Sequence, residues 1–324
     1  MPGLPLCGGL PEQTMATSRS RTRTLSPVPE WTATKAELRR LHASPRPRAV
    51  PILRSPLRIP PRDLRLLPTK FGPKELLLPE HWWRWFFCRP RYRVRKNQKN
   101  LTTMEWQRFL HAVAALRETG MPSPTYDEMV QIHVDAMGTH AGHAWGAHTM
   151  SGHAGRNFLA WHREYLARLE ARLIAINPLV TIPYWDWVTD RAAIPAALTD
   201  AADIADWGIT RNATFNGNSL ASAAQLNTLL AGVDFTAFQS TVEAAPFHNR
   251  LHVLVGGTMA TSRSPADPLF WLHHAFIDKL WADWQALHPG VNPPNVTEVL
   301  QPAPTLTRTV GQVLNTRALG YVYG

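Results

Sequence analysis

The 324-residue chain contains only two cysteines, Cys7 and Cys88, so a framework of disulfide bonds cannot hold its fold. With 44% hydrophobic residues, a chain of this length can bury a substantial core instead. It lacks any run close to the roughly 18 consecutive apolar residues of a membrane-spanning helix, and its start lacks the apolar segment of a secretory signal. Internal repeats and glycine-rich phosphate-binding loops are also missing. We therefore expect a cytoplasmic protein with no membrane partner.

Acidic residues are scarce in only one part of the chain. The formal net charge is +10, but residues 1–91 carry 17 Lys/Arg against 6 Asp/Glu, whereas residues 92–324 carry 17 against 18. The excess positive charge therefore belongs to the first part. The near-neutral balance of residues 92–324 argues against nucleic acid as their partner.

Residues 1–91 form a basic extension that is rich in proline and arginine and shows no sustained helical or alternating period. This composition predicts a segment that is disordered or loosely docked, or a start codon assigned too far upstream. A tail that binds polyanions is a further option. The run 82–87 (WWRWFF) is an apolar exception that could dock on the core as a flap. We place the domain boundary between residues 91 and 92.

Residues 92–324 have the pattern of a mainly α-helical domain. Thr102 and Glu105 have capping-box spacing ahead of a helix that ends before Gly120, and a second helix begins after Pro124. Residues 190–245 read as a long surface excursion with one short helix near 221–230. Further helices are predicted over about 157–176, 246–255 and 267–287. We expect a four-helix core with a few short strands and long loops.

Histidine is abundant in this domain, because all 14 histidines except His42 and His81 follow residue 92. His248 and His252 are four residues apart on a predicted helix, so both imidazoles project from one face at a separation suited to one metal ion. The next helix carries His273 and His274, which both lie on apolar stripes, so periodicity alone does not choose between them. One of this pair completes a three-histidine site.

A second three-histidine site is predicted from His133 and His162 on two helices and His153 on the loop before the second of them. The remaining loop histidines, His140, His143 and His148, are expected to be bystanders. All six ligands would be neutral imidazoles, a set that suits copper best, with zinc as the nearest competitor.

Four motifs give this region a family resemblance: Gly152-His153, residues 161–166 (WHREYL), residues 247–253 (FHNRLHV) and residues 267–274 (DPLFWLHH). Over about residues 92–289 the chain resembles the tyrosinase family of type-3 copper proteins in its short bacterial form. The resemblance implies a dinuclear copper centre and selects the second histidine of the pair at 273–274. The implied ligands are His133, His153 and His162 for copper A, and His248, His252 and His274 for copper B.

The resemblance also implies an activity. Members of the family use O2 to hydroxylate monophenols such as tyrosine at the ortho position and to oxidise o-diphenols to o-quinones. In these enzymes, a water molecule that accepts the proton of the phenol is held by a glutamate and by the asparagine that follows the first copper B histidine. Here these are Glu243 and Asn249, although Glu243 lies nearer His248 than in related bacterial enzymes. The expected partners are a small phenol, O2 and a copper-delivery protein of the caddie type.

Two departures bear on access to the copper ions. Residues 150–153 (MSGH) contain no cysteine, so the thioether found in fungal and plant relatives cannot form. Residues 256–264 (GGTMATSRS) contain no aromatic side chain. Only about 35 residues follow the helix predicted at 267–287, so we expect no shielding domain over the site. We expect a site that a phenol can reach.

Other functions would use the same histidines. A catechol oxidase without monophenol hydroxylation, or an o-aminophenol oxidase, needs the same six ligands. A hemocyanin-like carrier would bind O2 reversibly at the same centre, and a dizinc hydrolase would use a histidine-rich site without redox chemistry, usually with carboxylate ligands.

Two charged residues lie beside the predicted ligands. Arg163 follows His162, and Asp278 lies one turn beyond His274, so both would be costly if they were buried without a partner. We predict that they pair across the interface between their helices. The alternative is that both reach solvent and contribute little.

Overall fold

The computed structural model describes residues 92–118, 120–138, 145–148 and 155–324, so the basic extension with residues 82–87 lies outside the described residues. The predicted boundary at residue 91 therefore stays a prediction. The described part is mainly helical with a few short strands, as expected. Its α-helices are α3 (Thr103–Leu116), α4 (Tyr126–Ala136), α6 (Phe158–Ile176), α7 (Ala201–Asp206), α8 (Ala223–Ala231), α9 (Phe235–Glu243), α10 (His248–Val255) and α11 (Leu269–Leu287).

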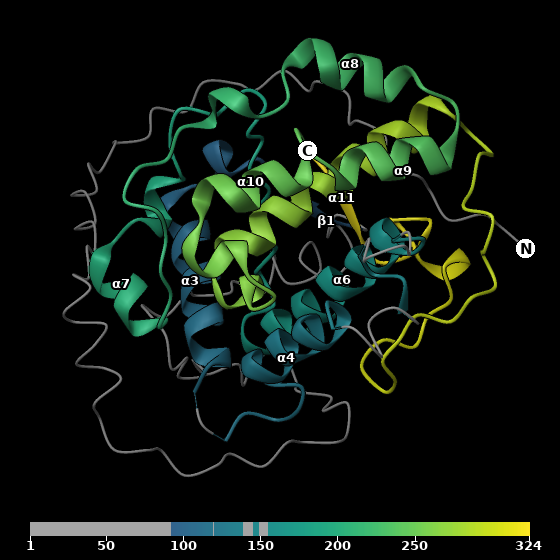
Figure 1. The fold of residues 1–324 in the computed structure, drawn as a ribbon. Helices are drawn as coiled ribbons and strands as arrows, with labels where there is room; N and C mark the ends of the chain where they lie inside the picture. Colours follow the sequence, from purple (N-terminus) through teal and green to yellow (C-terminus); the bar gives the residue numbers. More distant parts are fainter. Residues whose placement is uncertain (1–91, 119, 139–144, 149–154) are drawn as a thin grey trace, which may run out of the picture. The chain divides into compact units, whose positions relative to one another are not determined.

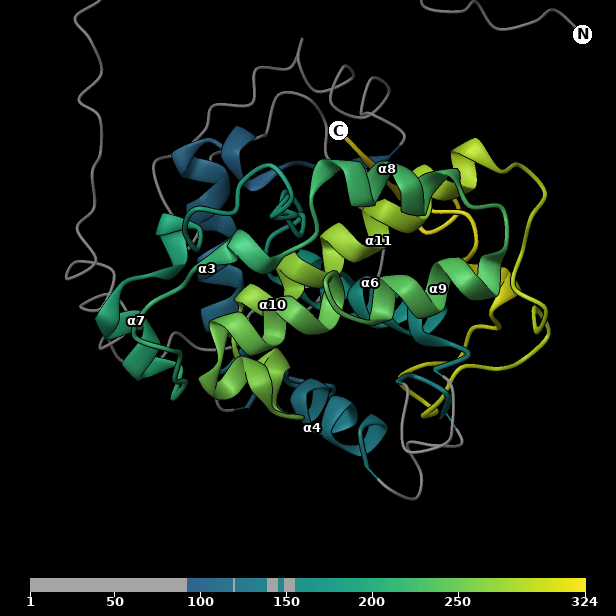
Figure 2. The same cartoon turned by 45° about the horizontal axis from the view of Figure 1, so that its top comes forward.

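Helices α6 and α11 pack against each other and lie between α4 and α8 in both views (Figures 1 and 2). Every side chain from 269 to 278 in α11 and from 158 to 166 in α6 is buried. A helix that is buried on all sides belongs to the interior of a domain. The two helices that carry most of the predicted chemistry are thus the centre of the core.

The helix boundaries follow from local sequence. Thr102 and Thr125 each accept a hydrogen bond from the third residue of the helix that follows, and Glu105 and Glu128 complete the two capping boxes. The first of these caps was predicted, and α3, α4, α6, α10 and α11 all lie where the periodicity placed them.

The expectation for residues 190–245 was wrong in part, because this stretch contains α7 and α9 in addition to the short helix α8. Helix α9 begins after Asp234, whose carboxylate accepts from Ala237 N, and it buries Phe235, Phe238 and Val242. These three residues have the spacing of one helical face. The signal was present, but the surrounding Ala, Asn and Gly residues diluted it.

Strand β1 (Arg93–Arg95) pairs in parallel with β2 (Tyr321–Tyr323). This pairing brings residues from the two ends of the described domain together beside α6 and α11. Among the described helices, none combines the length and the apolar character that crossing a membrane requires.

A buried charge network joins these two strands to the central helices. The guanidinium of Arg163 pairs with the carboxylate of Asp278, as predicted, and both side chains are at most 2% exposed. Asp278 also accepts hydrogen bonds from Arg95 at 3.3 Å and from the hydroxyls of Tyr321 at 2.6 Å and Tyr323 at 2.5 Å. One carboxylate therefore connects α6, α11, β1 and β2.

The network keeps Asp278 ionised despite its burial. Burial by itself would raise the pKa of this carboxyl, but Arg163, Arg95 and the two tyrosine hydroxyls hold the pKa below its ordinary value. Because the pKa is lower in the folded state than in the unfolded state, the stabilisation is present above the unfolded pKa of about 3.9 and is lost as the pH falls through the folded pKa.

Asp278→Asn should destabilise the copper-free protein by about 3–5 kcal/mol at pH 7, because it leaves the buried guanidinium of Arg163 without a charged partner, whereas Arg95 keeps Glu170. Urea unfolding measures the loss, which should shrink only below pH about 4. The control is Asp283→Asn on the same helix, where the carboxylate is 41% exposed and pairs with Lys279. This control should change stability by less than about 0.5 kcal/mol. Equal effects of the two substitutions would contradict the structural role of Asp278.

Candidate metal centre

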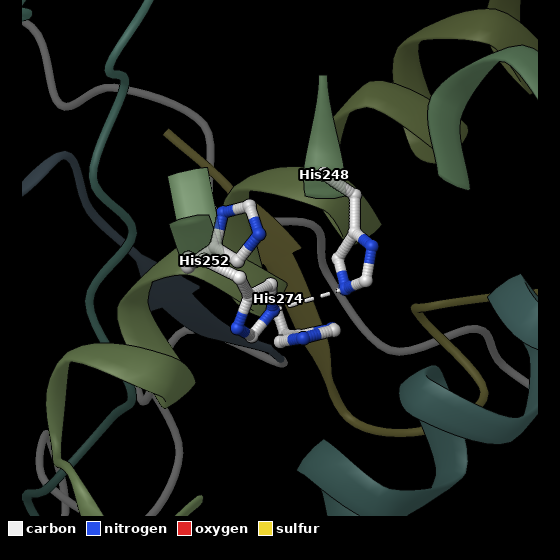
Figure 3. A group of neighbouring side chains, drawn as sticks. His248, His252 and His274 are labelled. Carbon is white, nitrogen blue, oxygen red and sulfur yellow. Dashed lines mark hydrogen bonds between the residues drawn. The ribbon is translucent and has the colours of Figure 1, made fainter. Parts of the chain in front are cut away.

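Seven histidine side chains gather in two groups where α4, α6, α10 and α11 meet. Within each group, one ring nitrogen per residue lies within 4.8 Å of those of all the other members. In Figure 3 the rings of His248 and His252 from α10 and of His274 from α11 turn toward one another. The first group contains His133, His148 and His162, and the second contains His248, His252, His273 and His274.

Five of the six predicted ligands lie in these two groups. His133 and His162 lie in the first, with ring centroids 6.0 Å apart, and His248, His252 and His274 lie in the second. His153, His140 and His143 lie outside the described residues.

His148 was expected to be a bystander, but it lies in the first group. Its side chain is buried, and its Nε2 is 3.1 Å from Nε2 of His133. The sequence offered no signal for this placement, because the loop around His148 has neither helical nor alternating periodicity.

Backbone carbonyls fix the orientation of four of these rings. The Nδ1 atoms of His133, His162 and His252 lie 2.7, 2.8 and 2.6 Å from the carbonyl oxygens of three separate residues. A carbonyl oxygen only accepts hydrogen bonds, so each Nδ1 carries a proton and donates it. His248 is held in the same way. The acceptors are Ser262 O for His133, Phe158 O for His162, Met259 O for His252, and both Glu243 O and Asn249 Oδ1 for His248.

This arrangement leaves lone pairs on the Nε2 atoms inside the site. The Nε2 atoms of His248 and His252 face each other at 3.1 Å, the contact drawn as a dashed line in Figure 3. Since both Nδ1 atoms donate to carbonyls, neither neutral ring has a proton on Nε2 to share. Two lone pairs at this distance repel each other unless a cation lies nearby. Buried Nε2 atoms of His162 and His274 also have no hydrogen-bond partner.

Burial keeps the imidazoles neutral. It lowers the pKa of His133 to about 3 and that of His252 to about 4, and it lowers the pKa of His162, His248 and His274 well below the ordinary value. The neutral ring is the form that binds a metal ion. Neutral nitrogen ligands without a carboxylate or thiolate favour copper.

The two groups adjoin each other. The ring of His162 stacks on that of His274 with centroids 4.2 Å apart and an angle of 13° between the planes. The ring of Phe158 lies 4.8 Å from both His162 and His248. The side chains of one group therefore contact those of the other, as a dinuclear centre requires.

The segment between α10 and α11 serves both groups. Its carbonyl at Ser262 holds His133 of the first group, and its carbonyl at Met259 holds His252 of the second. The segment begins with Gly256 and Gly257, which have φ values of +66° and +51°. A Cβ atom on Gly257 would overlap the backbone carbonyl of Thr210.

Gly257→Ala should therefore lower the copper content as well as the stability, because both carbonyls would shift with the displaced backbone. We expect a loss of about 2 kcal/mol or more from strain and overlap. The control is Gly290→Ala, where φ is +86° but no atom lies within 4 Å of the new Cβ. It shares the backbone strain without the overlap, so its copper content by elemental analysis should match the parent protein. A full complement of copper in the Gly257 variant would contradict the role of this segment.

Comparisons with known proteins agree with this geometry. A family model described as the common central domain of tyrosinase matches residues 123–219 and 196–287. The chain is 36% identical to the tyrosinase of Streptomyces glaucescens over 242 residues. The aligned region covers 61% of this chain and 84% of that protein. The chain is 27% identical over 288 residues to grixazone synthase of Streptomyces griseus, which covers 67% and 92%.

The fold is also that of a solved hemocyanin unit. A functional unit of octopus hemocyanin superimposes with a TM-score of 0.58 at 25% identity, over 71% of this chain and 68% of that one. The matched region contains both histidine groups, and their all-imidazole donors suit a pair of copper ions. The chain belongs to the tyrosinase family of type-3 copper proteins.

Proposed function

We propose that this protein is a phenol oxidase that hydroxylates monophenols at the ortho position and oxidises o-diphenols to o-quinones with O2. The observation that carries the proposal is the pair of adjoining histidine groups, whose inward Nε2 atoms offer neutral ligands to two metal ions. When bound, two copper ions supply the electrons that activate O2. The ligand set that we propose is His133, His153 and His162 for copper A, and His248, His252 and His274 for copper B.

The phenol must also lose its proton, and residues of the protein have to assist this step. A phenol has a pKa near 10, so its ionisation at pH 7 costs roughly 4 kcal/mol. We assign the proton to a water molecule held by Glu243 and Asn249, which lie at the end of α9 and in the first turn of α10. Both residues adjoin His248: Glu243 O and Asn249 Oδ1 are the two acceptors of its Nδ1 proton.

A cavity lies beside Glu243, but neither Asn249 nor any of the seven grouped histidines lines it. Glu243 is 5% exposed and lines a cavity of about 160 Å³ together with Gln239 and Ser240 of the same helix. The buried position of Glu243 next to His248, on the same ring nitrogen as Asn249, is what supports its role as a general base that acts through water.

Copper loading of the full chain tests the proposal. We expect two copper ions per chain and, after reduction and exposure to O2, consumption of tyrosine, of a catechol and of 2-aminophenol at different rates. Oxidation of catechol or 2-aminophenol without tyrosine would assign the protein to the oxidases that lack monophenol hydroxylation. Reversible O2 binding without turnover would indicate a carrier. His288→Ala, outside both groups, is the control and should keep both copper ions, whereas His274→Ala should lose one.

Asn249 gives a sharper test of the proton transfer. Asn249→Ala should depress monophenol hydroxylation by about tenfold or more while changing catechol oxidation less, because a monophenol depends more on the oriented water. Asn249→Asp keeps an oxygen that can accept from His248 Nδ1 but lacks the amide donor. If Asn249 acts only by orienting His248, the aspartate variant should recover both activities, and the alanine variant should lose both equally. Steady-state rates on tyrosine and on a catechol separate these outcomes.

A further inference from the structure

The second histidine group contains one more imidazole than a catalytic copper site with an open position requires. Four residues, His248, His252, His273 and His274, each offer a ring nitrogen within 4.8 Å of the others. Catalytic metal sites of this type keep one position open for substrate, whereas four protein ligands close a tetrahedral site. Some feature of the protein therefore has to keep one of these histidines away from the metal.

His273 differs from the other rings in its hydrogen bonding. Its Nδ1 lies 3.0 Å from Nε1 of Trp187, and both side chains are fully buried. The indole N–H is a donor only, so Nδ1 of His273 must accept. The ring is then neutral, and its single proton lies on Nε2. This is the opposite tautomer to that of His248 and His252, whose Nδ1 atoms donate to carbonyls.

With this hydrogen bond, neither ring nitrogen of His273 has a free lone pair to offer the metal. The Nδ1 lone pair is occupied by the indole N–H, and the Nε2 atom carries the proton. Binding a metal through Nε2 would require the proton to move to Nδ1, where it would face the N–H of Trp187. In the copper-free protein the Nε2 proton has no acceptor among the described residues. The shifted proton would break the hydrogen bond from Trp187 and place two buried donors face to face, which weakens such binding by an amount on the order of tenfold or more.

The position of Trp187 is itself fixed by its surroundings. The nearby Trp185 N donates to Leu272 O at 3.1 Å, which ties the segment to α11 immediately before His273. The indole of Trp187 also packs edge-on against Phe276, one turn further along α11. On the other side, the ring of His273 stacks on that of His248 with an angle of 13° between the planes.

We propose that Trp187 is a positioning residue that excludes His273 from the copper B ligands by fixing its tautomer. The site then has three available imidazoles at this metal, and one coordination position stays open. His273 acts as an apolar support on which the His248 ring stacks. The proposal concerns metal binding and does not depend on which phenol the protein oxidises.

The first test reads the tautomer directly. The full chain is labelled with ¹⁵N-histidine and studied by NMR in its copper-free and Cu(I)-loaded forms, with His273→Gln used to assign the signals. We expect His273 to carry its proton on Nε2 in both forms, and the ligand histidines to carry theirs on Nδ1. A proton on Nδ1 of His273 in the parent protein would overturn the proposal.

The second test asks whether His273 becomes a ligand once Trp187 is removed. His274→Ala should bind only one copper ion tightly, because His273 cannot replace the lost ligand. Adding Trp187→Phe should tighten binding of the second Cu(I) by about tenfold, and adding His273→Gln to that double variant should abolish the gain. Competition titration with a Cu(I) chelator measures these affinities.

The matched control is Trp185→Phe in the His274→Ala background. Trp185 is equally buried, lies in the same segment and donates its Nε1 proton to Asp190 O at 2.8 Å, away from His273. Its loss should leave the second Cu(I) affinity unchanged. The proposal is overturned if His274→Ala already binds two copper ions through His273. It is equally overturned if Trp187→Phe restores no binding, or if both tryptophan variants restore it to the same extent. In NMR, Cu(I)-loaded Trp187→Phe should show the His273 proton moved to Nδ1, and no movement would also overturn it.

Discussion

An imidazole has two nitrogens but only one proton when it is neutral, and the metal centre depends on where that proton lies. In His133, His162, His248 and His252 a backbone carbonyl accepts a hydrogen bond from the Nδ1–H group, and so the Nε2 lone pair faces inward. Two of these carbonyls belong to the segment between α10 and α11. That segment is in turn tied down by the buried pair of Arg211 and Asp267 at 2.7 Å. The orientation of His133 and His252 thus originates in backbone outside the helices that carry them, whereas His162 is held by Phe158 of its own helix.

The charges around the centre follow a consistent arrangement. The buried carboxylates of Asp278, Asp267 and Glu170 each pair with an arginine, and none belongs to either histidine group. Because the ligands are neutral and these acids are already compensated, bound copper ions would keep their positive charge. A cationic centre attracts the phenolate form of a substrate, which connects the ion pairs to the proposed chemistry.

Sequence reasoning predicted the parts of the fold that periodicity encodes. The capping box at Thr102, the helices that carry the histidines and the pairing of Arg163 with Asp278 could all be predicted, because helical spacing determines which side chains share a face. Spacing alone could not decide between His273 and His274, since both lie on apolar stripes. The contact that distinguishes them comes from Trp187, which is 86 residues away in the sequence.

Contacts between distant segments explain the other differences as well. The burial of His148 depends on a loop with no regular period, so no local pattern indicated it. Asp278 was predicted to have one partner but has four, because Arg95, Tyr321 and Tyr323 reach it through the pairing of β1 and β2. Two strands of three residues give too little sequence signal for their pairing to be predicted.

The burial of the histidines also determines how readily they bind protons. The pKa of about 3 for His133 and about 4 for His252 lies below the value near 6.5 expected in the unfolded chain. Between these values the unfolded chain binds more protons, so the folded state loses stability as the pH falls through this range. Metal binding normally has to displace protons from its ligands. At neutral pH these imidazoles are already mostly deprotonated in the unfolded chain. Below about pH 6.5 the cost of deprotonating His133 and His252 is met during folding and not when copper binds.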